Sequence, residues 1–378
     1  MTVTSLLQDL IRIPSVNPDA VPNAPYSGEA KMAAHLAPLL TDWGFKVTLE
    51  EVLPERPNLI ARAPGSNERP RILLGPHLDT VAIDGMTIEP FSGEEREGKI
   101  WGRGSSDTKG PMAAMLFALF QNKDQLADLP VAIDFVGFMG EESHQPGSKH
   151  FAQHHAQDYQ FALIGEPTSL HFVHATKGSL WATISATGKS THASQPHLGE
   201  NAILKLTASL DLLNRKLTNR LATFTHPVLG HSTLNIGTIS GGSSTNIVPD
   251  HAEATLDIRF TPDLQEVGGA QELLQTIITE NRLPVTITQA SEAPPMDVSA
   301  DHPWLQKFAT TQPNSKLVGA PWFSDAAHLN DAGLPAVCIG PGSIDQAHTA
   351  DEFISITDLE TGADWFSKLI KEVKYSSF

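Results

Sequence analysis

Two adjacent glutamates follow one of the most apolar stretches of the sequence. Residues 131–139 read VAIDFVGFM and predict a buried strand, and Glu141 and Glu142 come after a single further residue. Neighbouring carboxylates raise each other's pKa and lose hydration when they are buried, so such a pair needs a compensating role. Carboxylates at a strand end can bind a metal ion, move a proton, or divide these two tasks.

Other predicted strands place similar side chains at or just beyond their ends. They are His77 and Asp79 at the end of 71–79, Asp107 after 99–104, Glu166 within 161–167, and His348 after 335–342. Ligands of open α/β sheets bind beyond the carboxyl ends of the strands, so we expect these side chains to converge. Their convergence would build one site from segments far apart in the sequence.

Imidazole nitrogens and carboxylate oxygens are the ligands that a hydrolytic zinc site uses when no thiolate is present. Two metal ions about 3.5–4 Å apart need a bridging carboxylate and roughly two further ligands each. Five candidates fit this number, with Asp107 in the middle: His77, Asp107, Glu142, Glu166 and His348. Glu141 is then free to act as general base on a water activated by the metals. Asp79 can accept the other ring N–H of His77 and fix its tautomer.

Taken singly, these residues have simpler interpretations. An isolated pair such as His77 and Asp79 is usually not a metal site, and Glu141 with Glu142 could form a solvated loop. His348 alone is most often a surface residue. The metal hypothesis therefore depends on the agreement of five strand ends.

The composition excludes several classes of partner. The chain has 378 residues, 40% of them apolar and 18% charged, as is usual for a globular protein of one or two domains. Its net charge of −17 argues against nucleic-acid binding. The single cysteine, Cys338, allows no disulfide within the chain and no cysteine-based zinc site, which fits a reducing compartment. Without a secretion signal or a run of roughly 20 apolar residues, we expect a cytoplasmic protein with no membrane partner.

The order of the predicted elements indicates one domain inserted into another. Strands at 46–52, 58–63, 71–79, 99–104, 131–139 and 161–167 alternate with helices near 28–43, 109–122 and 148–155, which predicts an α/β sheet covered by helices. Residues 179–291 follow a β-α-β-β-α-β order instead, the split pattern of ferredoxin-like units. The α/β character then resumes with a strand at 335–342 and a helix at 358–375. We therefore predict a metal-binding catalytic domain from 1–178 plus 292–378, and a second domain at 179–291.

Several motifs resemble those of the cocatalytic zinc hydrolases that include acetylornithine deacetylase, succinyl-diaminopimelate desuccinylase, aminoacylase and glutamate carboxypeptidase. They are PHLDT, GRGSSDTKG, GEES, GEPTS, KGSLWATISATGKSTHAS, TNIVPDHAEATLDIRF and GPGSIDQAHTADEF, in family order over nearly the whole chain. The C-terminal motif is most similar to the acetylornithine deacetylase group. The resemblance implies a zinc-peptidase-like α/β catalytic domain with an inserted ferredoxin-like α+β lid and dimerisation domain. It also implies a homodimer with two Zn²⁺ per chain, although Co²⁺ or Mn²⁺ can occupy similar sites.

The resemblance also implies roles for individual residues. One zinc would be bound by His77, Asp107 and Glu166, the other by Asp107, Glu142 and His348, with Glu141 as general base and Asp79 orienting the first histidine. His192 matches a lid histidine that reaches the substrate or its oxyanion, usually from the partner subunit. Asn246 and Arg259 match lid residues that hold the substrate carboxylate, for which the guanidinium fork is suited. A structural ion pair is the alternative for Arg259.

The sequence departs from the family pattern in two places, and only the second bears on the substrate. Pro76 precedes His77 where many relatives have glycine, and Trp322 and Phe323 stand where desuccinylases have a glycine-rich segment. The aromatic pair argues against a succinyl substrate and predicts a more apolar pocket wall. We expect a hydrolase that cleaves the amide bond of an N-acyl amino acid, with a dipeptidase or carboxypeptidase as the alternative and a non-catalytic binding protein as a third. The sequence leaves the acyl group, the amino acid and the native metal open.

Overall fold

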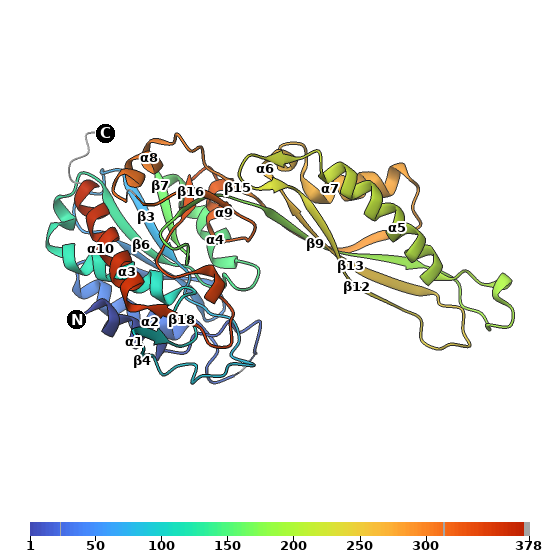
Figure 1. The fold of residues 1–378 in the computed structure, drawn as a ribbon, viewed down its shortest axis with the longest axis horizontal. Helices are drawn as coiled ribbons and strands as arrows, with labels where there is room; N and C mark the ends of the chain where they lie inside the picture. Colours follow the sequence, from blue (N-terminus) through green and yellow to red (C-terminus); the bar gives the residue numbers. More distant parts are fainter. Residues whose placement is uncertain (23, 313, 374–378) are drawn as a thin grey trace. The chain divides into compact units, whose positions relative to one another are not determined.

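The chain folds into two compact units. The computed structural model describes residues 1–22, 24–312 and 314–373 (Figure 1). Unit 1 comprises Met1–His174, Val298–Val318 and the chain from Ser324 onward, and unit 2 comprises Ala175–Asp297 and Gly319–Phe323. The catalytic and lid roles that we assigned to the two parts of the chain stay predictions.

A nine-stranded mixed sheet contains the strands whose ends carry the candidate ligands. Its order is β1 (Lys46–Leu53), β2 (Arg56–Arg62), β6 (Ala132–Gly137), β3 (Arg71–Pro76), β7 (Phe161–Gly165), β17 (Ala336–Cys338), β8 (Phe172–Thr176) and β15 (Met296–Asp297), with β16 (Leu317–Ala320) also paired to β8. The four neighbours β6, β3, β7 and β17 run parallel. Their carboxyl ends therefore meet at one edge of the sheet. This confirms the α/β class predicted for this part of the chain.

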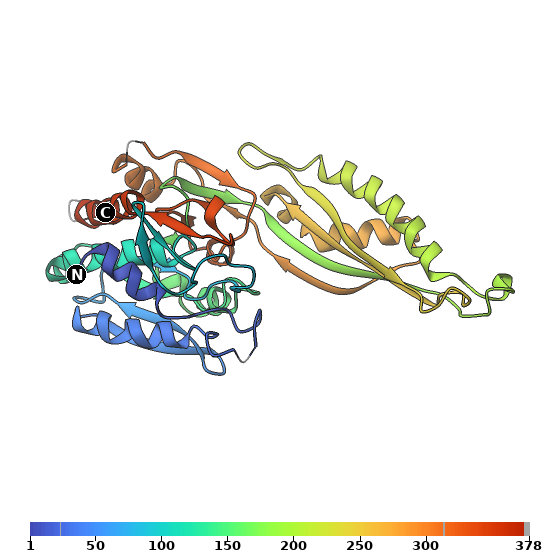
Figure 2. The same ribbon diagram turned by 60° about the horizontal axis from the view of Figure 1, so that its bottom comes forward.

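The central strands are apolar throughout because helices cover the sheet. Every residue of β3, β6 and β7 is buried, as expected for parallel strands with both faces covered. The longer helices of unit 1 are α1 (Val3–Ile11), α2 (Ala30–Asp42), α3 (Lys109–Asn122), α4 (Pro146–His155), α8 (Pro303–Thr310), α9 (Ala326–Asp331) and α10 (Ile356–Val373). Helices α1 and α10 both pack against α3, as Figure 2 shows. No described helix is long and apolar enough to span a bilayer.

One predicted strand belongs to a different sheet. We expected 99–104 to lie in the large α/β sheet, and this is wrong. Its first residues form β5 (Lys99–Trp101), which pairs with β4 (Glu94–Arg96) and β18 (Phe353–Ser355) in a separate three-stranded sheet. Asp107, six residues after β5, is therefore not delivered by the large sheet. The closing helix was predicted at 358–375, and its last two positions lie outside the described residues.

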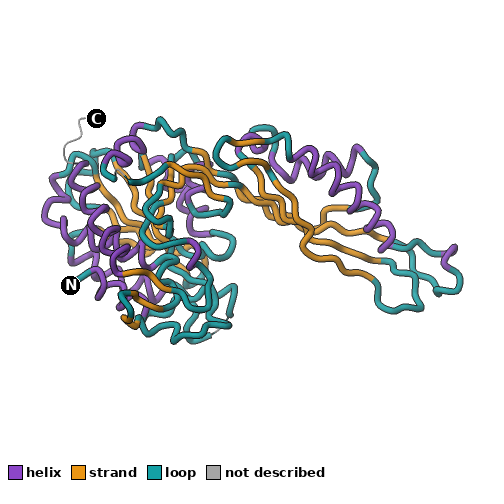
Figure 3. The backbone as a smooth tube through the Cα atoms, in the orientation of Figure 1, coloured by secondary structure: helices purple, strands orange, loops and turns teal. Residues whose placement is uncertain are grey.

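Unit 2 is a four-stranded antiparallel sheet with two main helices (Figure 3). In chain order its elements are β9 (Gly178–Thr187), α5 (Ala202–Leu221), β10 (Thr225–His226), β11 (Gly230–His231), β12 (Thr233–Gly241), β13 (His251–Phe260), α6 (Pro262–Gln265), α7 (Gly269–Glu280) and β14 (Thr286–Ala293). The sheet order β12-β13-β9-β14 is that of a ferredoxin-like unit. Buried residues of both helices and the sheet, such as Leu206, Leu256 and Ile277, form the core of unit 2. Strand β12 lies at one edge of the sheet and is mostly exposed.

Candidate metal centre

The strand ends of unit 1 gather the five predicted ligands. His77 directly follows β3, Glu142 lies five residues after β6, Glu166 directly follows β7, and His348 lies in the chain after β17. Two groups of three can each hold a metal ion, because one donor atom from every member lies within 4.8 Å of the others: His77, Asp107 and Glu166, and Asp107, Glu142 and His348. Asp107 belongs to both groups. The described residues therefore include two candidate ligand groups that share one carboxylate and could hold two metal ions.

The two oxygens of Asp107 face different imidazoles. Nε2 of His77 lies 3.1 Å from Oδ1 of Asp107, and Nε2 of His348 lies 3.4 Å from Oδ2. His348 Nε2 also lies 3.1 Å from Oε2 of Glu142. The other oxygen of Glu142 is buried and meets no hydrogen-bond donor in the part of the chain that the structure describes. A buried acceptor without a donor, beside a bridging carboxylate, fits a site built for cations.

The pKa shifts show how much negative charge the site gathers. Burial raises the pKa of Glu141 and Glu166 well above their usual range, and neighbouring carboxylates raise them further. Burial and the charge of Asp107 raise the pKa of Glu142 to about 7. Burial alone would also raise the pKa of Asp107, but hydrogen bonds from His348 and His77 hold it well below its usual range.

The histidines supply the compensating positive charge. Hydrogen bonds to Asp107 and Glu142 raise the pKa of His348 to about 10. Burial opposes protonation of His77, but the carboxylates of Asp107 and Asp79 raise its pKa well above the usual value. The protonated imidazoles therefore balance the charge of these carboxylates in the way that divalent cations would, because a cation also offers the carboxylates a positive partner.

Asp79 holds the two glutamates as well as the first histidine. Nδ1 of His77 donates to the main-chain oxygen of Asp79 at 2.9 Å, while the Asp79 carboxylate that we predicted as acceptor lies 3.6 Å away. That carboxylate instead accepts from the main-chain N–H groups of Glu141 and Glu142, both at 3.1 Å. With Nδ1 donating, the lone pair of a neutral His77 lies on Nε2, toward Asp107. Asp79 thus orients the ring and the Glu-Glu turn together.

Three buried polar residues around the site were not identified from the sequence. Asn17 donates to the Asp79 carboxylate at 2.7 Å, and Glu352 binds the segment before Asp107. Asp325 is fully buried, and burial raises its pKa to about 7, although the nearby Ser148 hydroxyl opposes this rise. A carboxylate inside the apolar run PWFSDAAHL was a signal for Asp325, whereas Asn17 lies in an ordinary polar loop.

In unit 2, His192 and Asn246 lie on adjacent segments. A bridge joins His192 to Ile247, and the N–H of Ala193 donates to the main-chain oxygen of Asn246 at 3.0 Å. The N–H of Ser194 donates to Nδ1 of His192 at 3.1 Å, so the proton of the neutral ring lies on Nε2. His192 is exposed and presents an N–H donor that a substrate oxygen can use.

Arg259 forms the ion pair that was the alternative to substrate binding. Its Nε and Nη2 donate to the two carboxylate oxygens of Asp257 at 2.9 and 3.1 Å. Arg259 also lies at the far end of β13 from His192. Arg259 pairs with Ser179 at the start of β9, whereas His192 follows the other end of β9. At about 3.3 Å per residue, the eight steps along the strand from His251 to Arg259 span roughly 26 Å. One copy of unit 2 therefore does not bring His192 and Arg259 together.

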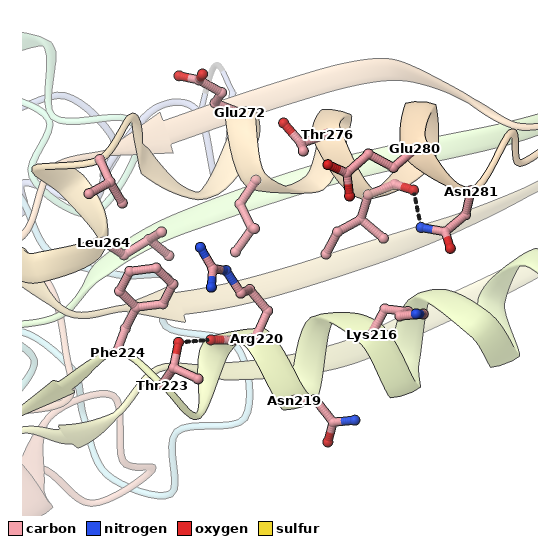
Figure 4. Close-up of a pocket in the computed structure, with 13 residues that line it drawn as sticks. Lys216, Asn219, Arg220, Thr223, Phe224, Leu264, Glu272, Thr276, Glu280 and Asn281 are labelled. Carbon is pink, nitrogen blue, oxygen red and sulfur yellow. Dashed lines mark hydrogen bonds between the residues drawn. The ribbon is translucent and has the colours of Figure 1, made fainter.

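A groove on unit 2 contains none of the candidate catalytic residues (Figure 4). It has a volume of about 670 Å³ and lies between α5 and α7. Its polar lining mixes cations and anions, including Lys216, Arg220, Glu272 and Glu280. The mixed charges select no ligand class, and the predicted metal ligands all lie in unit 1.

Comparisons with known proteins agree with the chemistry of the strand ends. Residues 73–372 match the peptidase family M20/M25/M40. The chain is 32% identical to acetylornithine deacetylase of Proteus mirabilis over 98% of this chain and 96% of that protein, and 28% identical to a probable succinyl-diaminopimelate desuccinylase of Staphylococcus epidermidis over 92% of each. Among solved structures, an M20 metallo-carboxypeptidase of Sulfolobus solfataricus aligns with a TM-score of 0.80 at 19% identity, and the alignment covers both chains fully. A tripeptidase of Staphylococcus aureus aligns with a TM-score of 0.78 at 23% identity, and the alignment covers 99% of this chain and 98% of the tripeptidase. The chain therefore belongs to peptidase family M20/M25/M40 and is a hydrolytic enzyme.

Proposed function

We propose that this hydrolase uses two zinc ions to cleave the amide bond of an N-acyl amino acid, as an enzyme of the acetylornithine deacetylase type. The observation that carries the proposal is the pair of ligand groups that share Asp107, with Glu141 beside them and in neither group. Relatives named acetylornithine deacetylase cover most of the chain at 30–32% identity and support this substrate class.

The ligand atoms suit zinc. His77, Asp107 and Glu166 would hold one ion, and Asp107, Glu142 and His348 the other. Bound there, the ions would lower the pKa of a water molecule and polarise the substrate carbonyl. The same nitrogen and oxygen donors also suit Co²⁺ and Mn²⁺.

The protein's own groups would carry the proton and the substrate. Glu141, fixed through its N–H by Asp79, takes a proton from water and passes it to the leaving amine. The Nε2–H of His192 stabilises the oxyanion that develops on the carbonyl. Asn246 and Arg259 bind the carboxylate of the amino acid, with Arg259 exchanging Asp257 for the substrate.

A complete site would then need two chains. Because His192 and Arg259 lie at opposite ends of the unit 2 sheet, a substrate that touches both must receive one of them from a second copy. Strand β12 offers an edge for this pairing, with Ile236 and Ile239 exposed on it. We therefore propose a homodimer in which His192 crosses to the partner's metal site. A cytoplasmic location fits the buried free thiol of Cys338.

A dipeptidase or carboxypeptidase is the second candidate. It would use the same metals and the same Arg259, but it would accept a second amino acid in place of a small acyl group. Trp322 and Phe323 favour this alternative, because bulky aromatic side chains can pack against the apolar side chain of a second amino acid more extensively than against a small acetyl group.

One activity screen tests both candidates. Protein loaded with zinc is assayed against N-acetyl amino acids, N-succinyl amino acids and dipeptides. We expect the highest kcat/KM on an N-acetyl amino acid. Preferred cleavage of dipeptides would replace the first candidate by the second, and failure to cleave any amide with two metals bound would contradict both.

A further inference from the structure

A buried glutamate holds the segment that carries the bridging carboxylate. Glu352 is fully buried, and its Oε1 accepts from the main-chain N–H groups of Ser106 and Asp107 at 2.8 and 2.9 Å. Its Oε2 accepts from the N–H of Gly104 at 2.9 Å and from Nη1 of Arg103 at 2.7 Å. One carboxylate therefore satisfies four donors within five consecutive residues, which end at Asp107.

The same glutamate is tied to the segment that carries His348. Strand β18 begins at Phe353, which pairs with Trp101 of β5, and the main-chain oxygen of Glu352 continues the pairing by accepting from Gly102 at 3.0 Å. His348 lies four residues before Glu352. The small sheet and the Glu352 side chain together lock the chain before Asp107 to the chain after His348.

We propose that Glu352 is a positioning residue that places Asp107 to bridge the two metals and sets its distance from His348. The inference rests on the proposed function and deepens it. Asp107 is the only residue common to both ligand groups, so a shift of its segment would disturb both metal sites. Asp107 does not follow a strand of the large sheet, and the Glu352 carboxylate fixes the segment that leads to it.

The chemistry of the contact requires a carboxylate of this length. Only an ionised carboxylate offers acceptors to four donors and a charge to Arg103, which is itself buried. Glutamine would keep one acceptor oxygen but would turn its NH₂ group toward N–H donors or the guanidinium. Aspartate would keep the charge and fall short of the main-chain N–H groups by one methylene.

The test compares Glu352→Gln with Asp134→Asn in the full-length protein. Asp134 is a matched control, because it is a fully buried carboxylate of unit 1 that accepts from Arg71, Tyr159 and the N–H of Ala63. Asp134 lies on β6, five residues before Met139, which ends the predicted strand, and is therefore away from the strand ends that carry the candidate ligands. Zinc affinity is measured by competition with a chromogenic chelator, and thermal unfolding is followed with and without zinc.

We expect Glu352→Gln to lower zinc affinity about 10- to 100-fold, the usual effect of losing a partner that orients a ligand. The rise in Tm on adding zinc should shrink in Glu352→Gln and stay unchanged in Asp134→Asn, even when both metal-free variants are destabilised. Glu352→Asp should recover part of the affinity. Wild-type zinc affinity in folded Glu352→Gln would overturn the proposal while leaving the proposed function intact.

A second variant covers the case in which Glu352→Gln does not fold. Arg103→Met combined with Glu352→Met leaves no unpaired buried guanidinium and removes the acceptor of the N–H groups of Ser106 and Asp107. Weak zinc binding by this folded double variant supports the proposal, and wild-type affinity overturns it. If the wild-type protein itself binds no zinc, the proposed function and this inference both fail.

Discussion

The candidate residues of unit 1 and those of unit 2 are held in different ways. In unit 1, side chains from five separate segments form two groups whose candidate ligand atoms lie within 4.8 Å of one another, and most of these side chains are buried. In unit 2, His192 and Asn246 lie near one end of the sheet, while Arg259 lies near the other and binds Asp257. One chain thus brings together all the residues of the candidate metal centre, whereas it does not bring together the proposed substrate residues.

This difference separates two kinds of catalytic contribution. Parallel neighbouring strands position four of the five candidate ligands because their carboxyl ends share an edge, and no second copy of the chain is needed for this. Residues at the two ends of an antiparallel sheet can act on one substrate only when a second copy completes the arrangement. We therefore expect mutations in unit 1 to act on metal binding and proton transfer, and mutations in unit 2 to act on substrate binding and subunit complementation.

The largest expected effect separates the adjacent glutamates. Glu141→Gln should lower kcat by about 10²- to 10⁴-fold, because it removes the general base, and should retain two metals per chain. Kinetics on the best substrate and elemental analysis of the same preparation check this. The matched control is Glu142→Gln, which we expect to lose metal as well as activity. Near-normal kcat in Glu141→Gln would show that another group moves the proton.

The next effect tests whether His192 crosses between chains. His192→Ala should lower kcat by about 10²- to 10³-fold, as the loss of an oxyanion donor does in other hydrolases. Mixing His192→Ala chains with Glu141→Gln chains should restore roughly a quarter of the wild-type activity, because half of the dimers are mixed and each mixed dimer has one intact site.

Subunit exchange must be shown independently, with differently tagged chains that co-purify after mixing. Each variant mixed with itself is the control and should stay inactive. Complete exchange without recovered activity would mean that His192 acts within its own chain or does not act, and it would remove the contrast between the two units.

A smaller effect distinguishes the two roles of Arg259. If the guanidinium binds the substrate carboxylate, Arg259→Met should raise KM by roughly 10- to 100-fold with kcat less affected. Asp257→Asn is the matched control, because it breaks the same ion pair and leaves the fork free for substrate. Both residues are about one-third exposed, so neither change should alter the free energy of unfolding by more than about 1 kcal/mol. Equal KM values in Arg259→Met and Asp257→Asn would show that the ion pair between these residues has only a structural role.

The smallest expected effect is the release of protons from the candidate metal centre when zinc binds. Zinc requires unprotonated ligands, while the pKa of His348 is raised to about 10, that of His77 is raised, and that of Glu142 is about 7. At pH 7 the metal-free site therefore holds protons that binding must expel, and affinity should fall as the pH is lowered. Titration calorimetry in buffers of different ionisation enthalpy should show release of at least two protons per chain. A zinc-binding enthalpy that is the same in every buffer would show that no protons are released and would contradict these protonation states.

The candidate ligands could be named from the sequence because four of the five follow apolar strands of the large sheet, and strand patterns are local. It misassigned residues 99–104, since a short apolar segment does not reveal which sheet it joins. The contacts of Asn17 and Glu352 could not be predicted, because hydrogen bonds across 62 and 245 residues of chain depend on the finished fold. The Arg259–Asp257 pair was named only as an alternative, since an arginine beside a carboxylate is equally suited to a substrate.

The most direct test of the account is a zinc-edge anomalous diffraction measurement on crystals of the zinc-loaded protein. The account predicts two peaks per chain, about 3.5–4 Å apart, one among His77, Asp107 and Glu166 and the other among Asp107, Glu142 and His348. Both peaks should contact Asp107, and Glu141 should contact neither. Peaks located elsewhere, or none at these residues in zinc-saturated crystals, would contradict the proposed metal centre and the hydrolytic mechanism built on it.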